Sequence, residues 1–198
     1  MNSQGSTLYR RISAYSASRQ TLAIAFLWGL AEATVFFLVP DVLLGFVALF
    51  NWRRGLLSTV WVVAGAMVGG AIMYALAVNN VVAMNQLLTS IPLVNANMVN
   101  LVREQVGRSG LSALVTGPLQ GIPYKIYAVQ VGAQGLALIP FLLFTIPARL
   151  ERILPVALVG AAVGVAFRKI IRRYPGLVVA GYVALWVCIY ALYTVRFR

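Results

Sequence analysis

Acidic residues stand inside stretches of this chain that are otherwise apolar enough for a lipid bilayer. Glu32, Asp41 and Glu151 make up three of its four carboxylates, and each lies in such a stretch. An ionisable group at bilayer depth costs several kcal/mol unless it is paired or lines a wet cavity. Pro40 interrupts the same segment as Glu32 and Asp41. These segments cannot be simple anchors, and they predict a pathway or binding site within a membrane.

The composition supports a membrane protein. The chain is 61% hydrophobic, whereas soluble domains are about 45–50% apolar. Its net charge of +12 does not predict nucleic-acid binding, because the basic residues do not form one continuous face. They cluster at the ends of apolar segments, as expected for cytoplasmic flanks and anionic headgroups. These clusters are Arg10, Arg11 and Arg19; Arg53 and Arg54; Arg168, Lys169, Arg172 and Arg173; and Arg196 and Arg198.

Residue types that support many enzymatic reactions are scarce. The chain has no histidine and a single cysteine, Cys188. A nucleophile–histidine–acid set is therefore excluded, and no metal cluster is indicated. No phosphate-binding loop or dinucleotide fingerprint occurs. We expect no catalytic residues, no metal and no cofactor, and we do not expect an enzyme.

The chain divides into a basic N-terminal segment, 1–20, and a single polytopic membrane domain, 21–198. The N-terminal segment is expected to be cytoplasmic, either as an interfacial helix or as a disordered tail. Apolar segments of sufficient length predict about three spanning helices. These are 56–78, 138–167 and 177–195.

The segment 22–50 predicts a re-entrant hairpin. It is longer than the roughly 20 residues of one span and shorter than the roughly 40 of two. Arginines flank it on both sides, which favours a cytoplasmic location for both ends. The turn is expected near Leu38–Asp41, with Pro40 at the tip.

A second re-entrant hairpin is predicted at 110–135, where glycines and prolines interrupt another apolar stretch. Its tip residues are Gly121 and Pro123. Residues 101–108 read as a short amphipathic connection, and the neutral loop before them fits the outer face. The second hairpin would therefore enter from the side opposite to the first. Broken helices that meet near the midplane are typical of transporters, so the expected fold is an all-α integral membrane protein with two such hairpins.

The segment 138–167 leaves two alternatives. Either it is one kinked helix with Arg149–Arg152 at mid-depth, or a break places these charges at an interface. The first is favoured because 153–167 alone is short for a span.

The charged side chains suggest two roles. Glu32 and Asp41 flank the first tip and could approach one cavity, where protonation would gate or couple transport. The alternative is a structural pair with a cation. Lys125, Arg149 and Arg152 could hold a phosphate headgroup, the arginines bidentately and the lysine as a point charge. The alternative for the two arginines is interfacial snorkelling.

Two further groups of residues are expected to be structural. Glu151 lies one position away from the face shared by Arg149 and Arg152, and a structural ion pair is its expected role. The tryptophans are expected at the membrane interface, where amphipathic aromatic rings concentrate. They are Trp28, Trp52, Trp61 and Trp186.

Two motifs resemble those of the DedA family, also described as SNARE-associated or VTT-domain membrane proteins. Glu32 followed by Pro40-Asp41 and Leu43-Leu44-Gly45 resembles its first re-entrant motif. Ser109–Leu114, leading to Gly121–Lys125, resembles its second. The likeness covers roughly 23–164. The chain departs from the family where an arginine usually starts the second motif, which indicates a divergent subgroup.

The resemblance implies lipid movement between leaflets. The expected function is a membrane transporter or scramblase for an anionic lipid, a polyprenyl phosphate or a phospholipid, with proton linkage open. It implies the plasma membrane (the inner membrane of a bacterium), a cytoplasmic N-terminus and a lipid partner with an anionic headgroup. No nucleic acid is expected, and homo-oligomerisation stays open. The alternatives are a proton-coupled antiporter of small ions or cations and a non-transporting membrane assembly factor.

Overall fold

The computed structural model describes residues 3–117 and 120–196, and this part of the chain is helical with no strand. Residues 1–2 of the predicted N-terminal segment, 118–119 of the predicted second hairpin and 197–198 lie outside it. The all-α prediction is confirmed for the described residues. The elements are α1 Ser3–Ala17, α2 Arg19–Thr34, α3 Asp41–Phe50, α4 Trp52–Asn79, α5 Val81–Ser90, α6 Ala96–Ser109, the 3₁₀ turn η1 Gly110–Ser112, α7 Ala113–Thr116, α8 Tyr124–Ala133, α9 Leu138–Ala166, α10 Arg168–Arg173 and α11 Pro175–Arg196.

Two of the described helices are long and apolar enough to cross a membrane. They are α4, Trp52–Asn79, and the part of α11 from Pro175 to Val195. The spans predicted at 56–78 and 177–195 fall inside them. The third predicted span corresponds to α9, which is one continuous helix with Pro147 and Pro155 inside it. Of the two alternatives for this segment, the structure therefore has the single helix, and Arg149–Arg152 lie near its middle.

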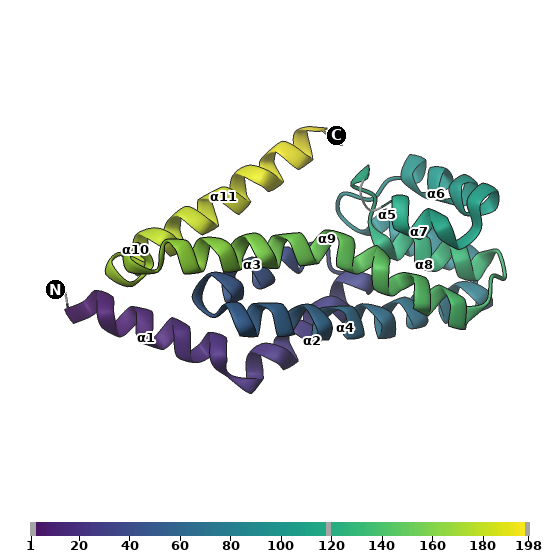
Figure 1. The fold of residues 1–198 in the computed structure, drawn as a ribbon. Helices are drawn as coiled ribbons and strands as arrows, with labels where there is room; N and C mark the ends of the chain where they lie inside the picture. Colours follow the sequence, from purple (N-terminus) through teal and green to yellow (C-terminus); the bar gives the residue numbers. More distant parts are fainter. Residues whose placement is uncertain (1–2, 118–119, 197–198) are drawn as a thin grey trace.

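The long helices α4 and α9 lie side by side and form the axis of the molecule, on which the shorter helices pack (Figure 1). Glycines allow the closest approaches. A Cβ atom added to Gly65 of α4 would overlap the backbone of Phe26 in α2, and one added to Gly164 of α9 would overlap the backbone of Leu49 in α3. Small residues at these crossings let two backbones approach closely.

The first interrupted segment has two helical limbs that run in opposite directions. Helix α2 ends at Thr34 and α3 begins at Asp41. Pro40 precedes α3, and the Asp41 carboxylate lies in its first turn, where the helix dipole favours a negative charge. Trp28 donates from Nε1 to the carbonyl of Leu38 at 3.0 Å and holds the connecting loop. Both limbs pack on α4, and the loop 35–40 separates them.

The second interrupted segment begins earlier than the predicted 110–135. Its first limb is α6–η1–α7, residues 96–116, and its second limb is α8. The residues predicted as a connection belong to α6, because Met98, Val99, Val102 and Val106 form a buried stripe along it at the spacing of an amphipathic helix. This stripe packs on α8. The polar residues beside it therefore lie on the other face of a helix and do not mark a connection between elements.

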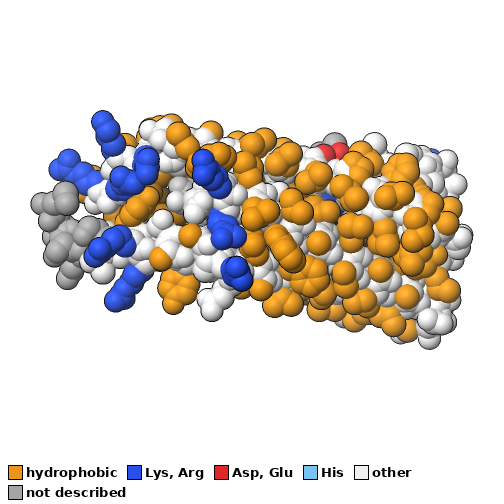
Figure 2. All heavy atoms as spheres, turned by 60° about the horizontal axis from the view of Figure 1, so that its bottom comes forward, with side chains coloured by type: hydrophobic (Ala, Val, Ile, Leu, Met, Phe, Trp, Pro, Cys, Tyr) orange, Lys and Arg blue, Asp and Glu red, His pale blue; other side chains and the backbone are white. Residues whose placement is uncertain are grey.

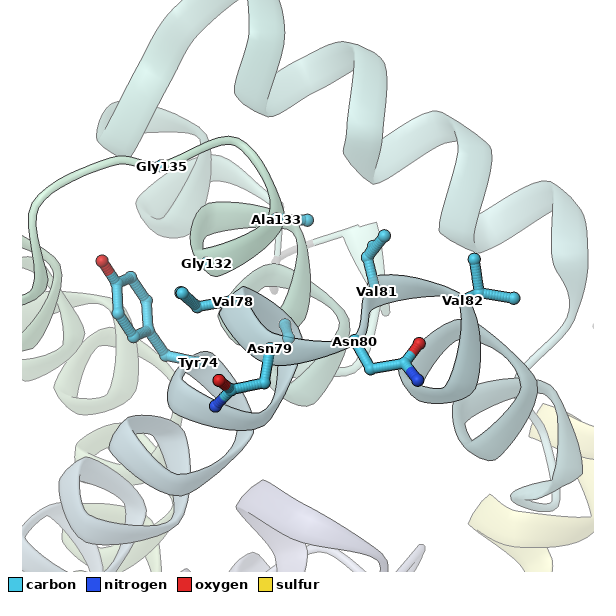
Figure 3. A pocket seen from close by; sticks show the side chains of 10 residues that line it. Tyr74, Val78, Asn79, Asn80, Val81, Val82, Gly132, Ala133 and Gly135 are labelled. Carbon is cyan, nitrogen blue, oxygen red and sulfur yellow. The ribbon is translucent and has the colours of Figure 1, made fainter.

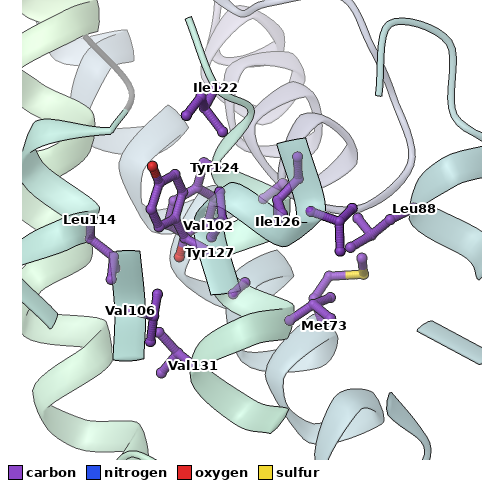
Figure 4. Close-up of a cluster of buried hydrophobic side chains, with 14 of the residues drawn as sticks. Met73, Leu88, Val102, Val106, Leu114, Ile122, Tyr124, Ile126, Tyr127 and Val131 are labelled. Carbon is purple, nitrogen blue, oxygen red and sulfur yellow. The ribbon is translucent and has the colours of Figure 1, made fainter. Parts of the chain in front are cut away.

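Helix α8 lies at the centre of the largest hydrophobic cluster. Nearly its whole length is buried, and a helix that is enclosed on every face belongs to a core. Figure 4 shows Tyr124, Ile126 and Tyr127 of α8 among side chains from α4, α5, α6 and α7. The second element of the predicted hairpin is therefore a buried helix, and it fixes the position of Lys125 in the interior.

Basic side chains gather at one end of the molecule, and a broad apolar surface covers much of the remaining length (Figure 2). The basic end is formed by α1, α10 and the first turns of α2 and α4. Helix α11 starts there and extends away from the other helices in Figure 1. The residues at this end are Arg10, Arg11, Arg19, Arg53, Arg54, Arg168, Lys169, Arg172 and Arg173.

Candidate functional site

The two interruptions of the chain meet in the interior. Lys125, in the first turn of α8, donates from Nζ to the carbonyl of Phe36 at 2.7 Å. Phe36 lies in the loop between α2 and α3, and the lysine side chain is buried. The first loop therefore contacts the start of the helix that follows the second loop, as expected for two broken segments that share one site.

Arg149 of α9 forms a sealed ion pair with Glu32 of α2. The side chains are only 1% and 4% exposed. The guanidinium carbon also lies 5.1 Å from the centre of the Tyr124 ring, and the Tyr124 hydroxyl is 2.8 Å from that of Thr145. Arg149 was expected to bind a phosphate; in the structure its guanidinium pairs with Glu32, and it is not among the residues that line the cavity described below.

Arg152 forms a second, more open ion pair with Asp41 of α3. The Nη2 and Oδ2 atoms are 3.3 Å apart, and the side chains are 26% and 6% exposed. The second carboxylate oxygen of Asp41, Oδ1, is buried without a hydrogen-bond partner. Arg149 and Arg152 share a face of α9 through their i, i+3 spacing. Together they tie both sides of the first loop to the middle of one helix.

A cavity of about 510 Å³ lies where these elements meet. This volume is in the range of small-molecule sites. Its wall is mostly apolar, with charged side chains from four elements. The predicted tip residues Gly121 and Pro123 line it, whereas Pro40 does not. The charged lining residues are Glu32, Asp41, Lys125, Glu151 and Arg152, and the aromatic ones are Phe37, Trp186, Tyr190 and Tyr193.

Glu151 does not make the structural ion pair expected from the sequence. No lysine or arginine nitrogen of the described residues lies within 4 Å of its carboxylate. Its Oε1 atom is buried and has no hydrogen-bond partner. The helical position next to Arg152 turns Glu151 toward the cavity instead of toward a cation, so it is an unpaired acid in the site wall.

Tyrosines of α11 join this helix to both loops, and sequence reasoning missed them. The Tyr190 hydroxyl accepts a hydrogen bond from the Val39 amide at 2.8 Å. The Tyr193 hydroxyl donates to the carbonyl of Gly121 at 3.0 Å. Helix α11 is otherwise exposed to a large extent. These bonds therefore place its aromatic face over the cavity.

The spacing of these aromatic residues was a signal. Tyr182, Trp186, Tyr190 and Tyr193 recur at intervals of four, four and three residues, which places them on one helix face. Trp186 lines the cavity, and its expected place at the membrane interface stays a prediction. The expectation treated each tryptophan singly and did not consider the tyrosines one turn away.

A larger cavity of about 570 Å³ lies at the junction of α4 and α5 (Figure 3). Its lining has no charged side chain, and the polar groups come chiefly from Tyr74, Asn79 and Asn80. The Tyr74 hydroxyl already donates to the carbonyl of Leu136 at 2.7 Å. Because charge and unpartnered polar atoms gather at the smaller cavity, we take the smaller one as the candidate site.

The donor set at the candidate site does not suggest a metal centre. Within residues 3–117 and 120–196, no three His, Cys, Asp or Glu side chains are grouped closely enough to hold an ion. Comparisons of the chain with protein-family models, curated proteins and solved structures find no match.

Proposed function

We propose that this chain is an integral membrane protein that moves an anionic lipid between the two leaflets. One observation carries the proposal. The two interruptions of the chain meet at a cavity whose apolar wall holds two cations and three carboxylates. Apolar walls suit a lipid tail, and cations suit a phosphate headgroup. Intramembrane charge that faces a cavity is typical of substrate pathways.

The arrangement of the helices supports a membrane setting. Helix α4 is long enough to cross, and α2 and α3 both reach its N-terminal end, where the basic residues gather. The limb α8 reaches toward its opposite end, since a Cβ added to Gly132 would overlap the backbone of Tyr74 in α4. Gln134, just after α8, donates to the carbonyl of Arg103 in α6 at 2.9 Å and joins the two limbs. We therefore propose two oppositely oriented re-entrant hairpins, with the basic end and the N-terminus in the cytoplasm.

Each charged side chain has a separate role in this proposal. Lys125 and Arg152 face the cavity and bind the headgroup phosphate. Asp41 competes with the phosphate for Arg152, so the existing ion pair opens when a headgroup arrives. Glu151, unpaired in the wall, provides a protonation site for coupling. Arg149 stays with Glu32 and positions the first loop without touching the lipid.

Leaflet transfer in vesicles tests this proposal. Purified wild type and Arg152→Gln would be reconstituted, and transfer of a labelled polyprenyl phosphate and of a labelled phospholipid would be measured. Arg103→Gln is the matched control, because Arg103 is an exposed arginine of α6 and lies away from the cavity. We expect transfer of one lipid by wild type and by the control, and a loss of at least about tenfold in Arg152→Gln.

Two outcomes contradict the proposal. One is transfer by no version of a folded protein. The other is equal transfer by wild type and Arg152→Gln, which would show that lipid moves without the charged cavity. The identity of the lipid that moves separates a polyprenyl phosphate carrier from a phospholipid scramblase.

Proton-coupled exchange of small cations is a second candidate. It is favoured by the two carboxylate oxygens without partners, Oδ1 of Asp41 and Oε1 of Glu151, because free carboxylate oxygens attract cations. This function predicts a cation flux that depends on a proton gradient in the same vesicles and is lost in Glu151→Gln. Absence of such a flux in folded protein would remove this candidate.

A further inference from the structure

A separate cavity of about 450 Å³ opens at the basic end, at a distance from the central site along the helices. Helices α1 and α10 and the junction of α3 with α4 enclose it, and its wall is more polar than apolar. Its polar lining residues are Tyr9, Ser13, Asn51, Arg168 and Arg172.

The two arginines at this cavity have no carboxylate partner among residues 3–117 and 120–196. Arg168 and Arg172 are four residues apart on α10 and therefore point the same way. In the described residues, neither guanidinium joins an ion pair, and Arg172 lies over the Tyr9 ring at 5.5 Å. Of the four acidic residues of the chain, three line the central cavity, and Glu104 pairs with Arg108 on α6 at 3.4 Å. No carboxylate of the described residues therefore neutralises these two arginines, and they are available to an external anion.

We propose that this cavity binds the phosphate of an anionic membrane lipid. The forked guanidinium groups of Arg168 and Arg172 match phosphate oxygens bidentately, and the Tyr9 and Ser13 hydroxyls line the same space. An exposed lysine patch would offer only diffuse attraction. Here a cavity that is open to the surface adjoins the charge, and it is large enough for a glycerophosphate headgroup.

The surroundings favour a lipid over a free phosphate ion. Exposed apolar side chains lie close to the arginines along the chain: Val165 on α9, Phe167 between α9 and α10, and Ile170 on α10. The cavity floor continues into buried Leu49, Phe50 and Ile171. A lipid would place its phosphate between the arginines and its acyl chains along the apolar surface. Such a lipid would join α1 to α10, and its binding does not depend on lipid transfer through the central cavity.

Thermal unfolding of the purified full chain in a neutral detergent tests this site. Short-chain phosphatidylglycerol would be titrated, with short-chain phosphatidylcholine as the zwitterionic comparison, which carries a phosphate but no net charge. We expect a saturable rise of the unfolding temperature with phosphatidylglycerol only. The double variant Arg168→Gln/Arg172→Gln should bind at least about tenfold more weakly, because it loses two charge-assisted contacts.

The control removes the same charge elsewhere. Arg103→Gln/Arg108→Gln lies on α6 at the opposite end and should respond like wild type. Equal weakening in both double variants would overturn the site, since it would show a general effect of net charge.

Saturation by inorganic phosphate or glycerol 3-phosphate at the same concentration would overturn the lipid assignment. If the Gln variant is unfolded, Arg168→Lys/Arg172→Lys keeps the charge and must still bind more weakly, because lysine lacks the fork.

Discussion

The two ion pairs of α9 differ although one helical turn separates them. Arg149 and Glu32 are sealed, with side chains 1% and 4% exposed, while Arg152 is 26% exposed beside Asp41. Both arginines reach the first interrupted segment, one on each side of its loop. The first pair is enclosed by α2, α8 and α9, although Glu32 also belongs to the cavity wall, and the second pair is the more exposed of the two at the central cavity. Sequence spacing alone would have made the two arginines equivalent.

This difference suggests that one ion pair of the cluster stabilises the fold and that the other takes part in ligand binding. A buried pair that loses one partner leaves an uncompensated charge, and this is strongly destabilising. A pair at a cavity can exchange its partner for a ligand or for water. We infer that Glu32–Arg149 fixes the site and that Asp41–Arg152 acts in it. The following changes test this division, in order of their expected effect on stability.

Replacing Arg149 by methionine should have the largest effect. Glu32 would remain buried without its cation, and the free energy of unfolding should fall by about 3–5 kcal/mol. Chemical unfolding in detergent measures this. The double variant Glu32→Gln/Arg149→Met removes both charges and should regain most of the loss. If the double variant is as unstable as the single one, the pair is not the structural element that we infer.

Removing the Tyr190 hydroxyl with Tyr190→Phe should cost about 1 kcal/mol, since the Val39 amide loses its acceptor. Hydrogen exchange should quicken in the peptide that contains residues 36–42. Tyr174→Phe is the control, because Tyr174 directly precedes α11 and does not line the cavity. Unchanged exchange in Tyr190→Phe would mean that α11 does not hold the first loop.

Arg152→Gln should lower the free energy of unfolding by no more than about 1 kcal/mol, because a partly exposed ion pair contributes little. Its effect should instead fall on lipid transfer. Measuring both properties on one preparation sharpens the comparison with Arg149→Met. A loss of stability as large as that of Arg149→Met would erase the difference between the two pairs.

Glu151→Gln should have the smallest effect on folding, within about 0.5 kcal/mol, because the carboxylate has no partner to lose. If Glu151 is the coupling site, the transport rate of this variant should depend less on pH than that of wild type. Gln also keeps the shape of the side chain. An unchanged pH profile would exclude Glu151 from coupling and leave Asp41 as the other cavity acid that has a carboxylate oxygen without a hydrogen-bond partner.

Part of the site was predictable because its residues break the apolar pattern. Glu32, Asp41, Lys125 and Arg152 stood out as charges in lipid-like sequence, and all four line one cavity. The tyrosines of α11 did not stand out, because tyrosine is ordinary in a membrane helix and its hydroxyl partners are backbone groups far away in sequence. The first limb of the second segment was also missed, because the polar residues of α6 were interpreted as a short amphipathic connection between elements.

The sequence by itself determined that the described part of the chain is all-helical, that two of its apolar segments are interrupted and which residues carry the charges. The spacing of apolar residues, the positions of prolines and the positions of charges are local properties, so they can be recognised in the sequence alone. Only the tertiary structure decided which acid meets which arginine, and that Glu151 is left unpaired. Those choices depend on the rotation of α9 against α2, α3 and α11. Close glycine crossings such as Gly164 on Leu49 set how closely α9 packs, and no local pattern records that rotation.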